Sequence, residues 1–238
     1  KGPYSVHVTD YLGNNLLHYA AAADSYHVAE NFISYFGKPF FYNEQQITPA
    51  HISAQRNNIE MLKIYHHTYP GMLTASSKRG WTPFHFAVFY GSFEAVDFLL
   101  QTCQIDVNQL VISAETSVGD YIPKNALRYY SALDLAYAVI KKDVLLDSEN
   151  ADSMKNYQKI VDLLLQHHAL PSLHAAVREN NLPAIGFHLF SPLSPFKDSV
   201  DAVSDYQKAT SLHFAAALGN YQVCHSLLQR GCSATKVD

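Results

Sequence analysis

The sequence has little charge, little cysteine and no long apolar run. Charged residues make up 16% of the 238 residues, and the net charge of −4 comes without a basic block or an acidic tail. Because nucleic acids and anionic membranes attract basic patches, neither is expected as a partner. No stretch approaches the roughly 18 consecutive apolar residues of a membrane-spanning helix, so no membrane insertion is expected.

The cysteines are three, and they are scattered as Cys103, Cys224 and Cys232. None belongs to a C-x-x-C pair, and an odd number cannot be fully paired within one chain. This pattern favours a reduced, intracellular and cytoplasmic setting over a small secreted domain held by disulfides.

Signatures of catalysis are missing too. The sequence contains neither a G-x-S-x-G turn nor a glycine-rich phosphate loop. His66-His67 and His167-His168 are adjacent pairs that point in different directions on a helix, whereas zinc needs three or four converging ligands. We therefore expect no enzyme, no catalytic residue, no metal and no cofactor; a small site in the loops near Cys103 is the alternative.

What the sequence does contain is one complete helix-turn-helix unit, residues 80–100. Thr82 can cap a helix whose first residue is Pro83, where the missing N–H costs nothing. Gly91 can adopt the left-handed conformation that ends this helix, and a second apolar helix follows from Glu94. Two such short helices cannot bury their apolar faces alone, so neighbours of the same kind are expected.

This unit resembles an ankyrin repeat, whose common pattern is G-x-T-P-L-H-x-A-A-x-x-G-x-x-x-x-V-x-x-L-L. Phe84 replaces the usual Leu and Val88 the second Ala. The pattern residues that it keeps are Gly80, Thr82, Pro83, His85, Ala87, Gly91, Val96, Leu99 and Leu100. The resemblance implies an all-α solenoid of stacked helix-turn-helix units.

Five other stretches match the pattern less completely. The period is that of the family, because His18 and His51 are 33 positions apart and His51 and His85 are 34 apart. Asp134 takes the histidine position in the fourth repeat. We predict about six repeats, after a lead-in or cap at 1–12, in an array over 13–238; the repeats lie near 13–36, 47–68, 80–102, 130–168, 171–190 and 209–232.

Long irregular insert loops interrupt this array. They are expected after the third repeat, inside the fourth and after the fifth. The last residues, 231–238, resemble the turn that enters a further repeat, so we expect either a longer protein or a trimmed cap.

The resemblance also implies a structural role for the histidines at one motif position. In ankyrin repeats this imidazole hydrogen-bonds local backbone and fastens the turn to the first helix. The histidines concerned are His18, His51, His85, His174 and His213.

The resemblance further implies that a protein partner binds in the concave groove, against the turn tips and the outward face of each first helix. Phe89 and Tyr90 occupy variable groove positions, and the stacking of repeats does not require them. Large aromatic and arginine side chains dominate binding energy at interfaces. The predicted partner-binding residues are Arg56, Arg79, Trp81, Phe89, Tyr90, Tyr129, Tyr130 and Arg178. Trp81, Phe89 and Tyr90 form an aromatic cluster in this set. The alternative is that the insert from Cys103 to Tyr130 folds over this cluster and buries it.

These features favour a monomeric, non-enzymatic protein–protein interaction module, with its groove centred on repeats two to four. The alternative is a substrate-targeting segment of a larger effector enzyme whose catalytic domain lies outside these residues. The irregular repeats, and the abundance of Asn, Tyr, Phe and His, resemble ankyrin proteins that intracellular bacteria deliver into the host cytosol. A eukaryotic or viral ankyrin protein is the rival source.

Overall fold

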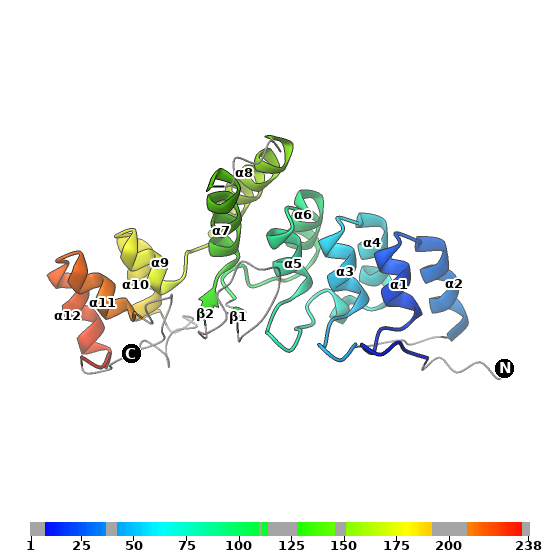
Figure 1. Cartoon of the computed structure of the whole chain (residues 1–238), viewed down its shortest axis with the longest axis horizontal. Helices are drawn as coiled ribbons and strands as arrows, with labels where there is room; N and C mark the ends of the chain where they lie inside the picture. The colour runs from blue at the N-terminus through cyan, green and yellow to red at the C-terminus, as the bar shows by residue number, and fades with distance from the viewer. Residues whose placement is uncertain are drawn as a thin grey trace. The chain divides into compact units, whose positions relative to one another are not determined.

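The computed structural model describes residues 8–36, 42–109, 111–113, 128–145, 151–191 and 209–234 of the chain. Helices dominate these residues and occur in consecutive pairs, two in each of the six predicted repeats (Figure 1). The pairs are α1 (Leu16–Ala22) and α2 (Tyr26–Phe36), α3 (Pro49–Gln55) and α4 (Ile59–Thr68), α5 (Pro83–Phe89) and α6 (Phe93–Thr102), α7 (Ala132–Leu145) and α8 (Ala151–Gln166), α9 (Leu173–Arg178) and α10 (Leu182–Phe190), and α11 (Ser211–Ala217) and α12 (Tyr221–Gln229).

The predicted all-α fold is confirmed, with two small additions. A single 3-10 turn, η1 (Pro70–Met72), follows α4. Strands β1 (Val111–Ser113) and β2 (Arg128–Tyr130) pair antiparallel within the insert after the third repeat, with Val111 opposite Tyr130. The sequence analysis did not predict this pair, because three-residue strands carry almost no periodic signal.

The chain forms two compact units. Unit 1 comprises residues 1–106 with 136–163, and unit 2 comprises 107–135 with 164–238. The division runs through the fourth repeat, because both α7 and α8 contribute residues to each unit.

Unit 1 has two layers of helices. The first helices α1, α3 and α5 pack side by side, and the second helices α2, α4 and α6 pack along them (Figure 1). Large side chains fill the space between, and Tyr65, Trp81 and Phe84 are among the most deeply buried. Each repeat buries too little alone, so this shared interior is what stabilises the unit.

Unit 2 repeats the same arrangement with smaller side chains. Its helices α9 to α12 pack as two pairs, and α9 also packs on α11. The interior consists of Leu173, Ala176, Val177, Ala184, Ile185, Leu189, Ala215, Val223, Leu227 and Cys232.

The turns between paired helices depend on residues that tolerate positive φ. Gly91 and Gly219 have φ of 73° and 66°, and Asn57 and Asn180 fill the same position with φ of 58° and 53°. Asparagine enters the left-handed region more readily than most residues, since its short polar side chain can hydrogen-bond locally. Both asparagines therefore take the place of the glycine in this turn.

Candidate partner-binding surface

Two of the motif histidines, His18 and His51, join their repeat to the one that follows it. The backbone N–H of Thr48 donates to Nδ1 of His51 at 3.1 Å, and Nε2 of His51 lies 2.9 Å from the carbonyl oxygen of Trp81 in the next repeat. His18 makes the same two contacts, with the N–H of Asn15 and the carbonyl oxygen of Ile47. The histidine at this position fastens the turn to the first helix, as predicted.

These contacts determine the protonation state of the imidazole. The Trp81 carbonyl oxygen can only accept, so Nε2 of His51 carries a hydrogen, and Nδ1 accepts from an N–H and therefore carries none. The ring is neutral. Burial lowers the pKa of His51 to about 4, although its bond to Trp81 acts in the opposite direction. Burial also lowers the pKa of His18.

Asp134 replaces the histidine in the fourth repeat and also joins the turn to the next repeat, but it accepts the hydrogen bond across the repeat boundary instead of donating it. Its Oδ2 accepts the N–H of Ser131 at 3.1 Å and the N–H of Ser172, at the start of the next repeat, at 3.0 Å. A carboxylate can only accept, so the partner across the repeat boundary changes from a carbonyl oxygen to an N–H.

The turn before α1 begins at Asp10, three positions before the predicted first repeat. Oδ1 of Asp10 accepts the N–H groups of Leu12 and Asn14, at 2.9 and 2.8 Å. Asn43 forms the matching turn before α3, where its Oδ1 accepts the N–H groups of Gln45 and Ile47. The N–H of Glu44 donates to the carbonyl oxygen of Leu12, so consecutive turns are joined through their backbones.

Six side chains define what we call the inner-helix face of unit 1. They occupy two equivalent positions in each of the first three repeats, on the first helix and at the residue that caps its C-terminus. The inner-helix face consists of Tyr19, Ile52 and Phe86 in one row and Ala23, Arg56 and Tyr90 in the other.

The predicted aromatic cluster is present, and it runs from the interior to the surface. The ring centroid of Trp81 lies 5.8 Å from that of Phe86 and 5.5 Å from that of Phe89, in edge-to-face arrangements. The Tyr90 ring continues the cluster at 5.2 Å from Phe89 and 6.3 Å from Phe86. Such contacts between rings add stabilisation beyond simple burial.

The members of this cluster differ in what they offer a partner. Trp81 is only 2% exposed, so its ring is a core residue and presents almost no surface. Phe89 is half-buried, and its backbone carbonyl accepts the hydroxyl of Tyr157 on α8 at 2.7 Å. Tyr90 is 42% exposed. Of the three predicted contact residues in this cluster, Tyr90 has the most accessible ring.

The alternative that the insert covers this cluster falls mostly on residues 110 and 114–127, outside the described residues. Part of the burial of Phe89 has another source. The Tyr157 side chain lies against the α5–α6 turn, where its ring atoms are 3.0 and 3.1 Å from the position that a Cβ on Gly91 would take.

The predicted arginines of unit 1 occupy different surroundings. Arg56 is exposed, and its Nε lies 3.6 Å from Oδ1 of Asp24, with both side chains 50% exposed. Arg79 is half-buried in the turn before α5. An exposed pair such as Arg56–Asp24 contributes little to stability and remains accessible to a partner.

The other predicted residues belong to unit 2. Tyr129 lies opposite Ile112 in the strand pair, and Tyr130 is half-buried. Arg178 is exposed in the last turn of α9, beside a surface hollow lined by Glu179, Leu218 and Tyr221. Tyr129, Tyr130 and Arg178 are therefore part of unit 2, whereas the aromatic cluster is part of unit 1.

Two exposed tyrosines, on and just before α1, were not among the predicted partner-binding residues. Tyr19 on α1 is 56% exposed and Tyr11 in the preceding turn is 85% exposed. They line a hollow between this turn, α1 and α3. Tyr19 is at the position of Ile52 and Phe86 in the following repeats, so aligning all three repeats at this position would have found it.

Neither a metal site nor a membrane-spanning helix is found in the described part of the chain. No group of three or more His, Cys, Asp or Glu side chains there has an arrangement that could hold a metal ion. No helix among those residues is both long enough and apolar enough to cross a bilayer.

Comparison with known families gives the same assignment as the geometry. The profile described as Ankyrin repeats (3 copies) matches residues 17–110, and the profile described as Ankyrin repeat matches residues 207–238. No curated protein matches the chain. The two matches together cover more than half of the sequence, and the chain belongs to the ankyrin repeat family.

Membership of this family has general consequences for function. Ankyrin repeats are generally protein–protein interaction modules, and their domains are typically non-catalytic. Residues 111–206, which neither profile covers, nevertheless contain the helix pairs α7–α8 and α9–α10.

Proposed function

We propose that unit 1 binds a protein partner through its inner-helix face, with Tyr90 as the main contact and Arg56 beside it. The observation that carries this proposal is the exposure of Tyr90. The C-cap position needs only a backbone N–H, which bonds to the Phe86 carbonyl oxygen at 3.0 Å. The repeat therefore does not require an aromatic side chain there.

The surroundings of Tyr90 favour tight binding. Its ring rests on Phe86 and Phe89, which hold it in one place, so little side-chain entropy is lost when a partner covers it. An anchored aromatic ring next to an arginine is the composition typical of binding hot spots, where truncation often costs about 2 kcal/mol or more.

The remaining predicted residues have different roles in this proposal. Arg79 lies in the turn before α5, whereas Phe89 packs against the Tyr90 ring and Trp81 packs against Phe89. Arg178, Tyr129 and Tyr130 would serve a second contact surface on unit 2. We further propose that the protein acts as a monomer and that its six helix pairs form the repeat array over residues 13–238.

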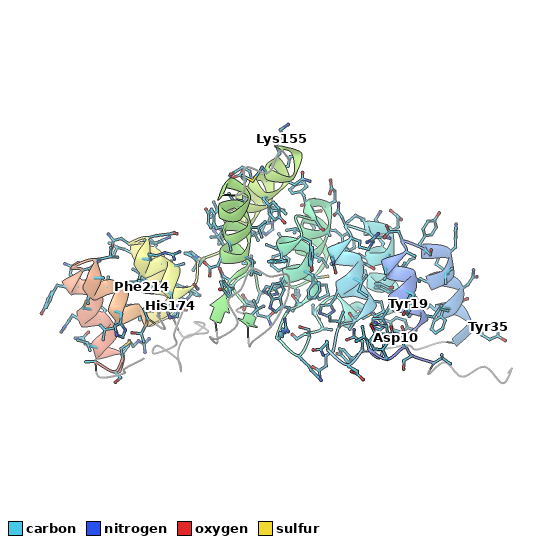
Figure 2. All side chains as sticks on the ribbon, viewed as in Figure 1. Asp10, Tyr19, Tyr35, Lys155, His174 and Phe214 are labelled. Atoms are coloured by element: carbon cyan, nitrogen blue, oxygen red, sulfur yellow. The ribbon has the colours of Figure 1, made fainter. Side chains whose placement is uncertain are left out.

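The test is partner capture with matched tyrosine variants. We expect Tyr90→Ala to lose a protein that the unchanged chain retains from a lysate of its source, while Tyr35→Ala retains it. Tyr35 lies on α2 and is 70% exposed, so it controls for the loss of any accessible tyrosine (Figure 2). Both variants should melt within a degree or two of the parent, because neither creates a buried cavity.

Equal retention by both variants would contradict the proposal, as would equal loss. A large fall in the melting temperature of Tyr90→Ala would also contradict it, because it would show that the ring stabilises the fold.

A further inference from the structure

The hollow at the start of unit 1 has a composition unlike the rest of the inner-helix face. Its volume is about 240 Å³, and it is lined by Asp10, Tyr11, Leu12, Asn14, His18, Tyr19, Ala22 and Ile52. Ligand pockets for drug-sized molecules usually measure roughly 300–1,000 Å³, so this hollow suits a single side chain.

Asp10 is the single negative charge in the lining, and the lining contains no lysine or arginine. Its carboxylate accepts four hydrogen bonds: from the N–H groups of Leu12 and Asn14, from Nδ2 of Asn14, and from the Tyr19 hydroxyl at 2.8 Å. Partial burial raises the pKa of Asp10, but these hydrogen bonds outweigh it and hold the pKa at about 2. The carboxylate is thus charged at any physiological pH.

The two tyrosines provide aromatic faces around this charge. The Tyr19 hydroxyl is held by Asp10 (Figure 2), which fixes the ring. The Tyr19 side chain is nevertheless 56% exposed, and that of Tyr11 is 85% exposed. The imidazole of His18 bonds the Ile47 carbonyl oxygen through Nε2. Burial lowers the pKa of this imidazole below its ordinary value of 6.5, so at neutral pH it offsets little of the charge of Asp10.

We propose that this hollow binds the guanidinium group of an arginine side chain of the protein partner. The charge complements Asp10, and a planar guanidinium can stack on a tyrosine ring. Since the acceptor positions of Asp10 are already occupied, stacking and charge hold the cation in place of a bidentate hydrogen bond. This inference rests on the proposed binding function of unit 1 and adds the chemistry of one partner residue.

The test uses N-acetyl-arginine methylamide as the probe and NMR signals of ¹³C-labelled tyrosine rings as the readout. We expect saturable shifts of the Tyr11 and Tyr19 signals with a roughly millimolar dissociation constant, weakened by added salt. N-acetyl-norleucine methylamide, which has a neutral chain, should cause no saturable shift at the same concentrations. N-acetyl-lysine methylamide should bind more weakly than the arginine probe, because an ammonium group is more strongly hydrated and does not stack.

Variants separate this site from the rest of the surface. Tyr11→Ala should weaken binding of the arginine probe about fivefold, whereas Tyr35→Ala should leave it unchanged. Tyr11 suits this test because it is almost fully exposed, so its removal should not affect folding.

Equal binding of the norleucine probe would overturn the proposal by showing an apolar site. Equal binding of the lysine probe, or unchanged binding by Tyr11→Ala, would overturn it too. If the arginine probe fails while Tyr90→Ala still loses the partner, this inference falls and the proposed function stands; the reverse pattern would reject the Tyr90 contact alone.

Discussion

Units 1 and 2 use the same motif around different interiors. In both, a threonine–histidine pair caps a first helix: Thr82 precedes α5 and His85 lies in its first turn, as Thr210 and His213 do at α11. The side chains that fill unit 1 include Trp81 and Tyr65, whereas the buried cluster of unit 2 has no aromatic member and is aliphatic apart from Cys232. The two units therefore share the residues that start their helices and differ in the size of the side chains that fill their interiors.

This difference bears on function because the aromatic rings of the unit 1 interior contact a ring that is exposed at its surface. The Trp81 ring supports Phe86 and Phe89, and these support the exposed ring of Tyr90. The equivalent C-cap residue of α11 in unit 2 is Leu218, an exposed aliphatic side chain. We therefore expect recognition by unit 1 to depend on rings that its own core holds in place.

The largest expected effect follows from removing the centre of the aromatic interior. Trp81→Ala should lower the free energy of unfolding by about 3–5 kcal/mol, because it deletes a buried side chain and leaves a cavity. Circular dichroism during urea unfolding would measure it. An effect below about 1 kcal/mol would show that Trp81 is not a core residue and would restore it as a candidate contact.

The next effect concerns pH, because unit 1 buries neutral histidines. The unfolded chain, with an ordinary histidine pKa of 6.5, binds more protons than the folded chain between pH 6.5 and about 4. Stability is thus full above pH 6.5 and is lost as the pH falls, with His51 contributing about 3 kcal/mol over this range.

His51→Gln should flatten this pH dependence, measured as the free energy of unfolding from pH 7 to 4. His213→Gln is the matched control, because His213 has the same motif position and an exposed side chain. Identical slopes in the parent and His51→Gln would contradict the neutral, buried imidazole.

A smaller effect on the free energy of unfolding is expected from substituting the two glycines that occupy the same motif position. Gly219→Ala should cost about 1 kcal/mol for placing a Cβ at positive φ, since nothing lies within 4 Å of that Cβ. Gly91→Ala should cost about 2–3 kcal/mol, because its Cβ would also meet the Tyr157 ring at 3.0 Å.

Fluorescence of Trp81, the single tryptophan, reports on unit 1 and would detect the Gly91 effect directly. Circular dichroism would follow both variants. Equal costs for the two substitutions would mean that Tyr157 does not pack on the α5–α6 turn.

The smallest effect is expected at the Arg56–Asp24 pair. Arg56→Ala should change the free energy of unfolding by less than about 0.5 kcal/mol, because the pair is half exposed to solvent. Partner affinity should nevertheless fall, by about tenfold if Arg56 belongs to the binding surface. A change in stability without a change in affinity would remove Arg56 from the site.

Much of the fold could be predicted because the residues that specify each repeat lie close together in the sequence. Thr82, Pro83 and Gly91 specify a helix, its start and its turn within ten residues, and His51 makes its cap bond three residues away. The burial of Trp81 was not predictable in the same way. It depends on Phe86 and Phe89 being aromatic together, which is a property of packing and not of spacing.

The candidate site shows the same limit. Tyr157 reaches the carbonyl oxygen of Phe89 across 68 positions of sequence that include an insert, so no periodic pattern indicated it. Tyr11 and Tyr19 are exposed because Asp10 folds the turn before α1 around its carboxylate. Local sequence patterns predicted the helices and turns. The accessibility of individual side chains depends on contacts between residues far apart in the sequence, which these patterns do not show.

The most direct test of the central claim is photo-crosslinking from the inner-helix face. A benzophenone side chain would replace that of Tyr90 in one sample and that of Tyr35 on α2 in a second. The predicted result is that one protein is crosslinked from position 90 and not from position 35. Crosslinking from position 35, with none from position 90, would contradict the central claim.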